Sequence, residues 1–169
     1  MNTDKFWSLI ESAREREGAP DSSDQIAAHL KSALEELSAE DLLGFQEQLW
    51  QRLSESYRWD LWAVAYIVNG GSSDDGFEYF CGWLISQGRQ YFEAALRDPR
   101  KAADRAEPGS DAHECEDILY AAFHVYETKT GQQPPPGNVR MPREGPAGTR
   151  WEEDDLPRLY PELCERFFS

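Results

Sequence analysis

The ten residues from 59 to 68 constrain the fold of this chain more than any other part of the sequence. Their order is Trp-Asp-Leu-Trp-Ala-Val-Ala-Tyr-Ile-Val, which is apolar on nearly every side of a helix. A helix that is apolar all round is buried inside a globular protein. The two alanines, Ala63 and Ala65, and the length of the run favour a helix over a buried strand. We therefore predict a central helix that the rest of the chain encloses.

Aromatic residues are concentrated around this run. Ten of the 21 aromatic residues lie in the segment 57–96, which carries only seven charged residues. We expect this segment to form the core, because aromatic side chains bury a large apolar area. Asn69–Gly71 ends the first helix, and Ser72–Asp75 caps a second, aromatic-rich helix that runs to Gly88. These two helices form a predicted central pair, and Arg89–Leu96 forms a further helical stretch.

Amphipathic helices are predicted on both sides of this core. Three of them begin after the capping residues Thr3, Ser22 and Ser38, and each has one apolar face at helical spacing. Another helix is predicted over residues 112–129. Together these elements predict an all-α fold, a compact helical domain of about seven helices.

The segment 132–149 has a different composition. It contains five prolines and three glycines, so regular structure is not expected there. Trp151 and the apolar residues of the tail that follows are expected to return to the core. We therefore predict that 132–149 is a surface strap before the C-terminal helix, within a single domain that spans residues 1–169.

The charge of the chain excludes several classes of partner. It has 32 acidic and 17 basic residues and a formal net charge of −15. This charge repels phosphate backbones and anionic membranes, so neither is expected as a partner. No apolar run approaches the roughly 20 residues of a membrane span, and the first residues lack the pattern of a signal peptide. With three widely spaced cysteines, Cys81, Cys115 and Cys164, these features predict a cytoplasmic protein with reduced thiols.

Familiar catalytic and nucleotide-binding motifs are absent from the sequence. His113, Cys115 and His124 are potential zinc ligands, but His124 follows His113 by 11 positions on the predicted helix, too far to share one ion. Cys81 lies within the aromatic core, where a thiol is usually inert. We predict no catalytic residue, no metal site and no cofactor.

A candidate binding cleft is predicted between the central helices. Its residues are Trp59, Asp60, Trp62, Ser73, Asp74, Asp75, Glu78, Trp83 and Arg89. Converging carboxylates there would offer oxygen ligands to a cation or bind a substrate. The favoured interpretation is structural: Ser72 or Ser73 caps the second central helix. The two aspartates that follow complement the helix dipole.

Asp60 is the polar residue embedded most deeply in the apolar run. A buried carboxylate there would have a raised pKa and would suit a general base. We favour an ion pair with Arg58 or Arg89, because structural pairs are the more common role of such a residue.

Three segments carry a resemblance to a known family. They are the run Trp59–Tyr66, the sequence Gly70-Gly-Ser-Ser-Asp-Asp-Gly-Phe-Glu-Tyr-Phe80, and Trp83–Gly88. With Phe6-Trp7, Asp98-Pro99, Trp151 and Tyr160-Pro161, they resemble the bacterial domain of unknown function 4240. The resemblance implies a small, mostly helical, cytosolic bacterial domain and implies no activity. Family members often carry an arginine at the position that is Cys81 here.

Two functions fit these observations. The first is a non-enzymatic interaction or regulatory module that binds a basic protein partner, because opposite charge speeds encounter and selects partners. The second is a small-molecule or metal-dependent enzyme with its pocket between the central helices. We favour the first, because no set of catalytic residues is recognisable in the sequence.

Overall fold

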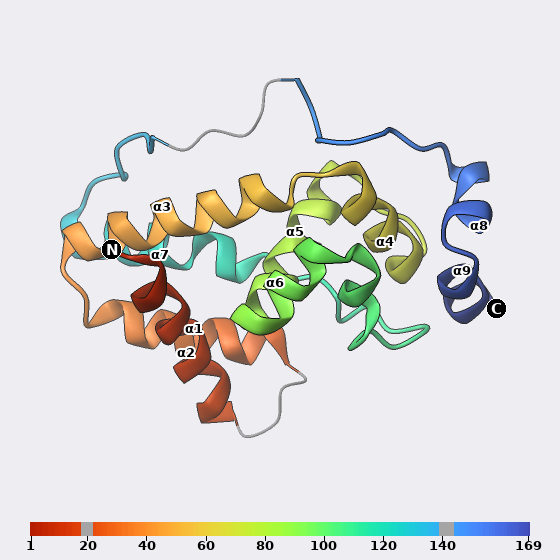
Figure 1. Ribbon diagram of the computed structural model, residues 1–169. Coiled ribbons are helices and arrows are strands. Elements are labelled where there is room, and N and C mark those ends of the chain that lie inside the picture. The colour runs from red at the N-terminus through yellow and green to blue at the C-terminus, as the bar shows by residue number, and fades with distance from the viewer. Residues whose placement is uncertain (18–21, 139–143) are drawn as a thin grey trace.

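The computed structural model describes residues 1–17, 22–138 and 144–169 (Figure 1). Within these ranges the chain forms nine α-helices, two 3₁₀ helices and no β-strand, which confirms the all-α class. The helices are α1 (Thr3–Glu17), α2 (Ser23–Glu35), α3 (Ala39–Ser56), α4 (Trp59–Asn69), α5 (Asp74–Ser86), α6 (Arg89–Arg97), η1 (Pro99–Ala103), α7 (Asp117–Thr130), η2 (Glu153–Asp155), α8 (Leu156–Leu159) and α9 (Pro161–Phe167). The tail contributes two short helices, and α9 begins at a proline, which lacks the N–H that would continue α8.

Helix α4 is buried on two opposite sides. Leu61, Val64 and Ala65 are fully buried in the main core, and Ala63 and Ile67 are fully buried in a second, smaller cluster. The second cluster is completed by the C-terminal helices, and α4 packs against η1, α5 and α9. This double burial explains why the run is apolar on nearly every side. Gly70 ends the helix in the left-handed conformation, with φ of 66°.

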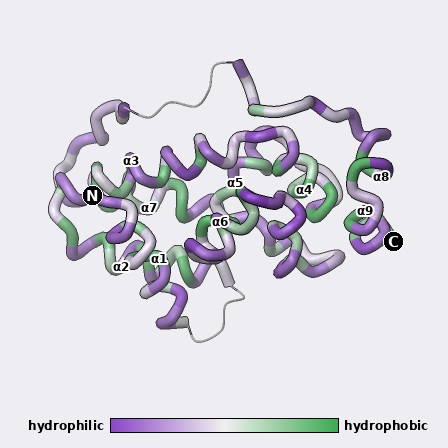
Figure 2. The backbone as a smooth tube through the Cα atoms, viewed as in Figure 1, coloured by the Kyte–Doolittle hydropathy of each residue, from purple (hydrophilic) through white to green (hydrophobic). Residues whose placement is uncertain are grey.

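The outer helices present one apolar face each to the main core. Phe6 of α1, Leu30 of α2 and Phe45 of α3 are fully buried, and α7 packs against both α2 and α3. Figure 2 shows hydrophobic and hydrophilic residues alternating along α3, as expected for a helix with one buried face. The caps predicted at Ser22 and Ser38 are present, since their side chains accept hydrogen bonds from the backbone N–H groups of Gln25 and Asp41.

The helix predicted over residues 112–129 begins later than expected, at Asp117. Residues before it cross α5 so closely that the backbone N–H of Cys115 donates to the carbonyl of Tyr79, at 2.9 Å. This approach is allowed because position 82 of α5 is a glycine: a Cβ there would collide with the Cys115 carbonyl oxygen. The tertiary contact therefore replaces the first helical turn.

The C-terminal segment returns across the molecule from the end of α7 to α8 and α9 (Figure 1). Its parts 132–138 and 144–149 contain no helix, and residues 139–143 of the predicted strap lie outside the described residues. Ala147 forms an isolated β-bridge at the α3–α4 junction, where its N–H donates to Tyr57 and its carbonyl accepts from Trp59. In the described part of the chain, no helix has the length and hydropathy needed to cross a bilayer.

Substitution Gly82→Ala tests the close contact between α5 and the segment before α7. We expect it to lower the free energy of unfolding by about 2–3 kcal/mol, because the new methyl group must displace backbone. Gly76→Ala is the matched control in the same helix, where the nearest atoms lie 3.4 Å from the new Cβ, so it should be neutral or stabilising by up to about 1 kcal/mol. Urea denaturation measures both, and equal effects would contradict this account.

Candidate functional site

A cavity of about 200 Å³ lies where α3 ends and α5 begins. Its lining consists of three carboxylates, Asp74, Asp75 and Glu78, and of the apolar side chains of Leu53, Tyr57, Phe77 and Cys81. We call it the acidic cavity. It has room for one long side chain and offers that side chain both apolar walls and negative charge.

The start of α5 positions the three carboxylates. Ser73 caps the helix, and its Oγ accepts a hydrogen bond from the N–H of Gly76 at 3.1 Å, as the sequence predicts. Asp74 and Asp75 occupy the first turn, where the helix dipole favours negative charge. Glu78 follows one turn later, so it lies on the same side of the helix as they do.

The electrostatics of the acidic cavity are uncompensated. The pKa of Glu78 is raised, first by burial and then by the negative charge of Asp75. Among the described residues, no lysine or arginine forms an ion pair with any of the three carboxylates. The sequence has no lysine or arginine from 59 to 88 or from 106 to 128. The cavity therefore holds negative charge without a cation of its own.

The neighbouring start of α7 adds to this charge. Tyr79 donates a hydrogen bond to Glu116 at 3.1 Å, and this contact raises the pKa of Tyr79 to about 12. The pKa of Tyr120 is also raised, by burial and then by the charges of Glu78, Glu116 and Asp75. Three carboxylates, Asp75, Glu78 and Glu116, thus act on one patch of surface.

One wall of the acidic cavity is the end of a stack of four aromatic rings. Trp59 and Trp62 stack at 5.3 Å between ring centroids, and Trp62 stacks on Phe77 at 4.9 Å. Tyr57 continues the stack on the other side of Phe77, at 6.3 Å. Phe77 and Tyr57 line the cavity, so its apolar wall is fixed by rings that reach back to α4.

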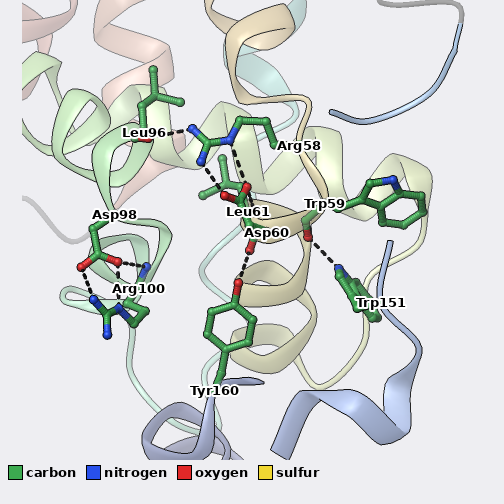
Figure 3. A network of polar contacts seen from close by, with 9 residues as sticks. All are labelled: Arg58, Trp59, Asp60, Leu61, Leu96, Asp98, Arg100, Trp151 and Tyr160. Atoms are coloured by element: carbon green, nitrogen blue, oxygen red, sulfur yellow. Dashed lines mark hydrogen bonds and ion pairs between the residues drawn. The ribbon is translucent and has the colours of Figure 1, made fainter. Parts of the chain in front are cut away.

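Asp60 does not line the acidic cavity and has a structural partner (Figure 3). Its two carboxylate oxygens accept from the Arg58 guanidinium at 3.0 and 2.5 Å. The same guanidinium donates to the carbonyl of Leu96 at 2.7 Å, and Asp60 also accepts from the N–H of Leu61. The predicted pairing of Asp60 with an arginine is confirmed, and the partner is Arg58.

Two more residues of the predicted cleft lie elsewhere. Arg89 pairs with Asp4 at 2.8 Å and with Glu93 at 2.7 Å, and with these acids it lines a separate depression between α1 and α6. Trp83 is buried and contacts His113 edge to face. Of the predicted set, the structure therefore gathers Asp74, Asp75 and Glu78 at one cavity, with Trp59 and Trp62 behind its wall and Ser73 as the cap. Sequence reasoning missed the other lining residues, which are Leu53 of α3, Tyr57 directly after it, and Phe77 and Cys81 of α5.

The chemistry of the acidic cavity does not include a reactive thiol. Burial raises the pKa of Cys81 to about 12, so the thiolate that would act as a nucleophile is not formed near neutral pH. Within the described ranges, no three residues among His, Cys, Asp and Glu are grouped so that they would hold a metal ion. The cavity presents apolar walls and three carboxylates.

The fold and the cavity together define an all-helical protein with an acidic cavity between the end of α3 and the start of α5. The chain belongs to the family described as Protein of unknown function (DUF4240), whose family model matches residues 1–128. The strap and the C-terminal helices follow the matched part. No curated protein and no solved structure matches the chain.

We expect His113 to make the stability of the protein sensitive to pH. Its Nε2 accepts a hydrogen bond from the backbone N–H of Glu107 at 3.1 Å, and burial lowers its pKa below the usual value near 6.5. The unfolded chain therefore binds a proton that the folded chain resists, and stability should fall as the pH drops through about 6.5. Urea denaturation between pH 5 and 7.5 measures this dependence.

Two variants isolate the contribution of His113. His113→Gln should flatten the decline of stability below about pH 6.5, although the lost packing lowers stability at every pH. His124→Gln, at an exposed position, should retain the wild-type profile. Parallel profiles for wild type and His113→Gln would show that another group is responsible.

Proposed function

We propose that this protein is a non-enzymatic interaction module that binds a basic segment of another protein, with one lysine or arginine side chain in the acidic cavity. The observation that carries the proposal is the unpaired Glu78 carboxylate, partly buried beside Asp75 in a cavity with apolar walls. Lysine and arginine match this arrangement, because each has an apolar stem and a cationic end.

The electrostatics support a cationic ligand. A raised pKa means that the fold disfavours the ionised form of Glu78, so the charged cavity lowers the stability of the protein. A bound cation reverses the sign of the local potential and makes ionisation favourable again. Binding sites commonly retain groups that are unfavourable for the unbound fold.

The whole chain supports the same kind of partner. Its net charge of −15 attracts a basic protein and repels nucleic acid and anionic membranes, which we do not propose as partners. Its three cysteines are free, which suits the cytoplasm as the place of action. We propose that residues 1–169 act as one domain, since the tail packs on α4.

An enzyme at this cavity has less support. Glu78 would act as a proton acceptor there, but a reaction needs further groups placed around the substrate. Of the residues that the sequence suggested for this role, Asp60 is bound to Arg58, and Arg89 is bound to Asp4 and Glu93.

Substitution Glu78→Gln separates binding from folding. The probe is a short Gly/Ser peptide with two arginines, titrated by calorimetry at low salt. Loss of the charge should weaken binding roughly tenfold, because a charge-assisted contact contributes about 1.5 kcal/mol. Glu15→Gln, an exposed change of the same charge on α1, is the matched control and should leave affinity nearly unchanged. Equal weakening by both variants would indicate only a general effect of net charge.

The pH dependence of stability gives a second test of Glu78. Its raised pKa means that the ionised carboxylate destabilises the folded state at pH 7, so Glu78→Gln should be more stable than wild type there. The advantage should shrink as the pH falls through the raised pKa towards the usual value of about 4.5, since wild-type Glu78 then takes up its proton. Thermal denaturation at pH 7 and pH 4.5 measures this difference, and a constant gap between the two proteins would contradict it.

A further inference from the structure

A larger cavity of about 850 Å³ lies between α3 and α7. We call it the aromatic groove. Its residues are Leu43, Gly44, Gln46, Glu47 and Trp50 from α3, Leu119, Tyr120, Phe123 and His124 from α7, and Pro134–Asn138. Tyr120 is 40% exposed and is therefore not needed to fill the core. Its ring stacks on that of His124, with 6.2 Å between the centroids.

The chain itself places prolines along this groove. Pro134, Pro135 and Pro136 line it together with the aromatic side chains, and Pro134 is half-buried. Both oxygens of the Glu47 carboxylate accept from the N–H of Asn138 at 3.2 Å, which holds the end of this stretch against α3. Proline runs form the polyproline II helix, which aromatic-lined grooves recognise in other proteins. The prolines of the chain itself thus indicate that a proline-rich segment fits against the aromatic groove.

The aromatic groove and the acidic cavity adjoin. Trp50 of the groove and Leu53 of the cavity are one turn apart on α3. On α7, Tyr120 of the groove lies one turn after Glu116, whose carboxylate binds Tyr79 of α5. A single extended ligand can therefore reach both sites.

We propose that the partner segment is proline-rich and carries a basic residue, with its prolines in the aromatic groove and its lysine or arginine in the acidic cavity. The basic half of this inference rests on the proposed function, and the proline half rests on the groove alone. A polyproline II segment is already ordered before it binds, so it loses little conformational entropy.

The geometry sets the spacing of the ligand. Trp50 of the groove and Leu53 of the cavity are three positions apart on α3, about 4.5 Å along the helix axis. Polyproline II advances about 3.1 Å per residue, so the basic residue should lie one or two positions from the nearest proline. The probe Arg-Gly-Pro-Pro-Pro-Gly-Arg satisfies this spacing in either chain direction.

Three peptides test the inference on the full chain by calorimetry. They are the probe, its proline-free analogue Arg-Gly-Ser-Gly-Ser-Gly-Arg, and its neutral analogue Gln-Gly-Pro-Pro-Pro-Gly-Gln. We expect the probe to bind roughly tenfold more tightly than either analogue, because each analogue retains only half of the contacts. Tyr120→Ala should remove the advantage of the prolines, Glu78→Gln should remove the advantage of the arginines, and Tyr120→Phe should retain the affinity because it keeps the ring.

The outcomes distinguish this inference from the proposed function. If the proline-free analogue binds as tightly as the probe and Glu78→Gln weakens both, the inference is wrong and the proposed function stands. If Glu78→Gln changes no affinity, both are wrong. If Tyr120→Ala and Tyr120→Phe weaken the probe equally while both proteins melt like wild type, the ring is not the contact, and the inference is wrong.

Discussion

The burial of α4 on opposite sides is the constraint on which the rest of the structure depends. A helix with Leu61 and Val64 on one side and Ala63 and Ile67 on the other is unstable in water until both sides are covered. The main core covers the first side, and Leu156 with Cys164 covers the second. Each large apolar side chain that is fully buried contributes about 1.5–3 kcal/mol, so neither cover is dispensable for a small protein.

This requirement links the C-terminal segment to the candidate site. The strap bonds to Tyr57 and Trp59 through Ala147, and the indole N–H of Trp151 donates to the carbonyl of Trp59 at 2.6 Å (Figure 3). Tyr57 and Trp59 are also the two ends of the ring stack that forms the wall of the acidic cavity. The segment that completes the burial of α4 therefore also fixes one wall of the site, although it follows the part of the chain that the family model matches.

Local patterns predicted the parts of this structure that neighbouring residues determine. The caps at Ser22, Ser38 and Ser73 and the pair of Asp60 with Arg58 involve residues at most three positions apart, so the sequence contains both partners. The cavity was only half predictable. Its acids follow a cap on α5, but Leu53 of α3 and Tyr57 directly after α3 reach it through tertiary packing. Arg89 was misplaced for the same reason, because its partner Asp4 is 85 positions away. The late start of α7 likewise depends on a contact with α5 that no local pattern contains.

The charge at the acidic cavity differs from that at the ion-paired acids of the surface. Asp98, for example, is paired with Arg100 at 2.8 Å, which lowers the pKa of Asp98. At the acidic cavity the pKa of Glu78 moves the opposite way, because burial and a like charge act on it together. Such a group weakens the unbound fold, whereas glutamine in its place would retain the shape without the charge. The carboxylate makes physical sense where a cation from outside the chain completes it. A partner segment bound in the adjoining aromatic groove would carry that cation.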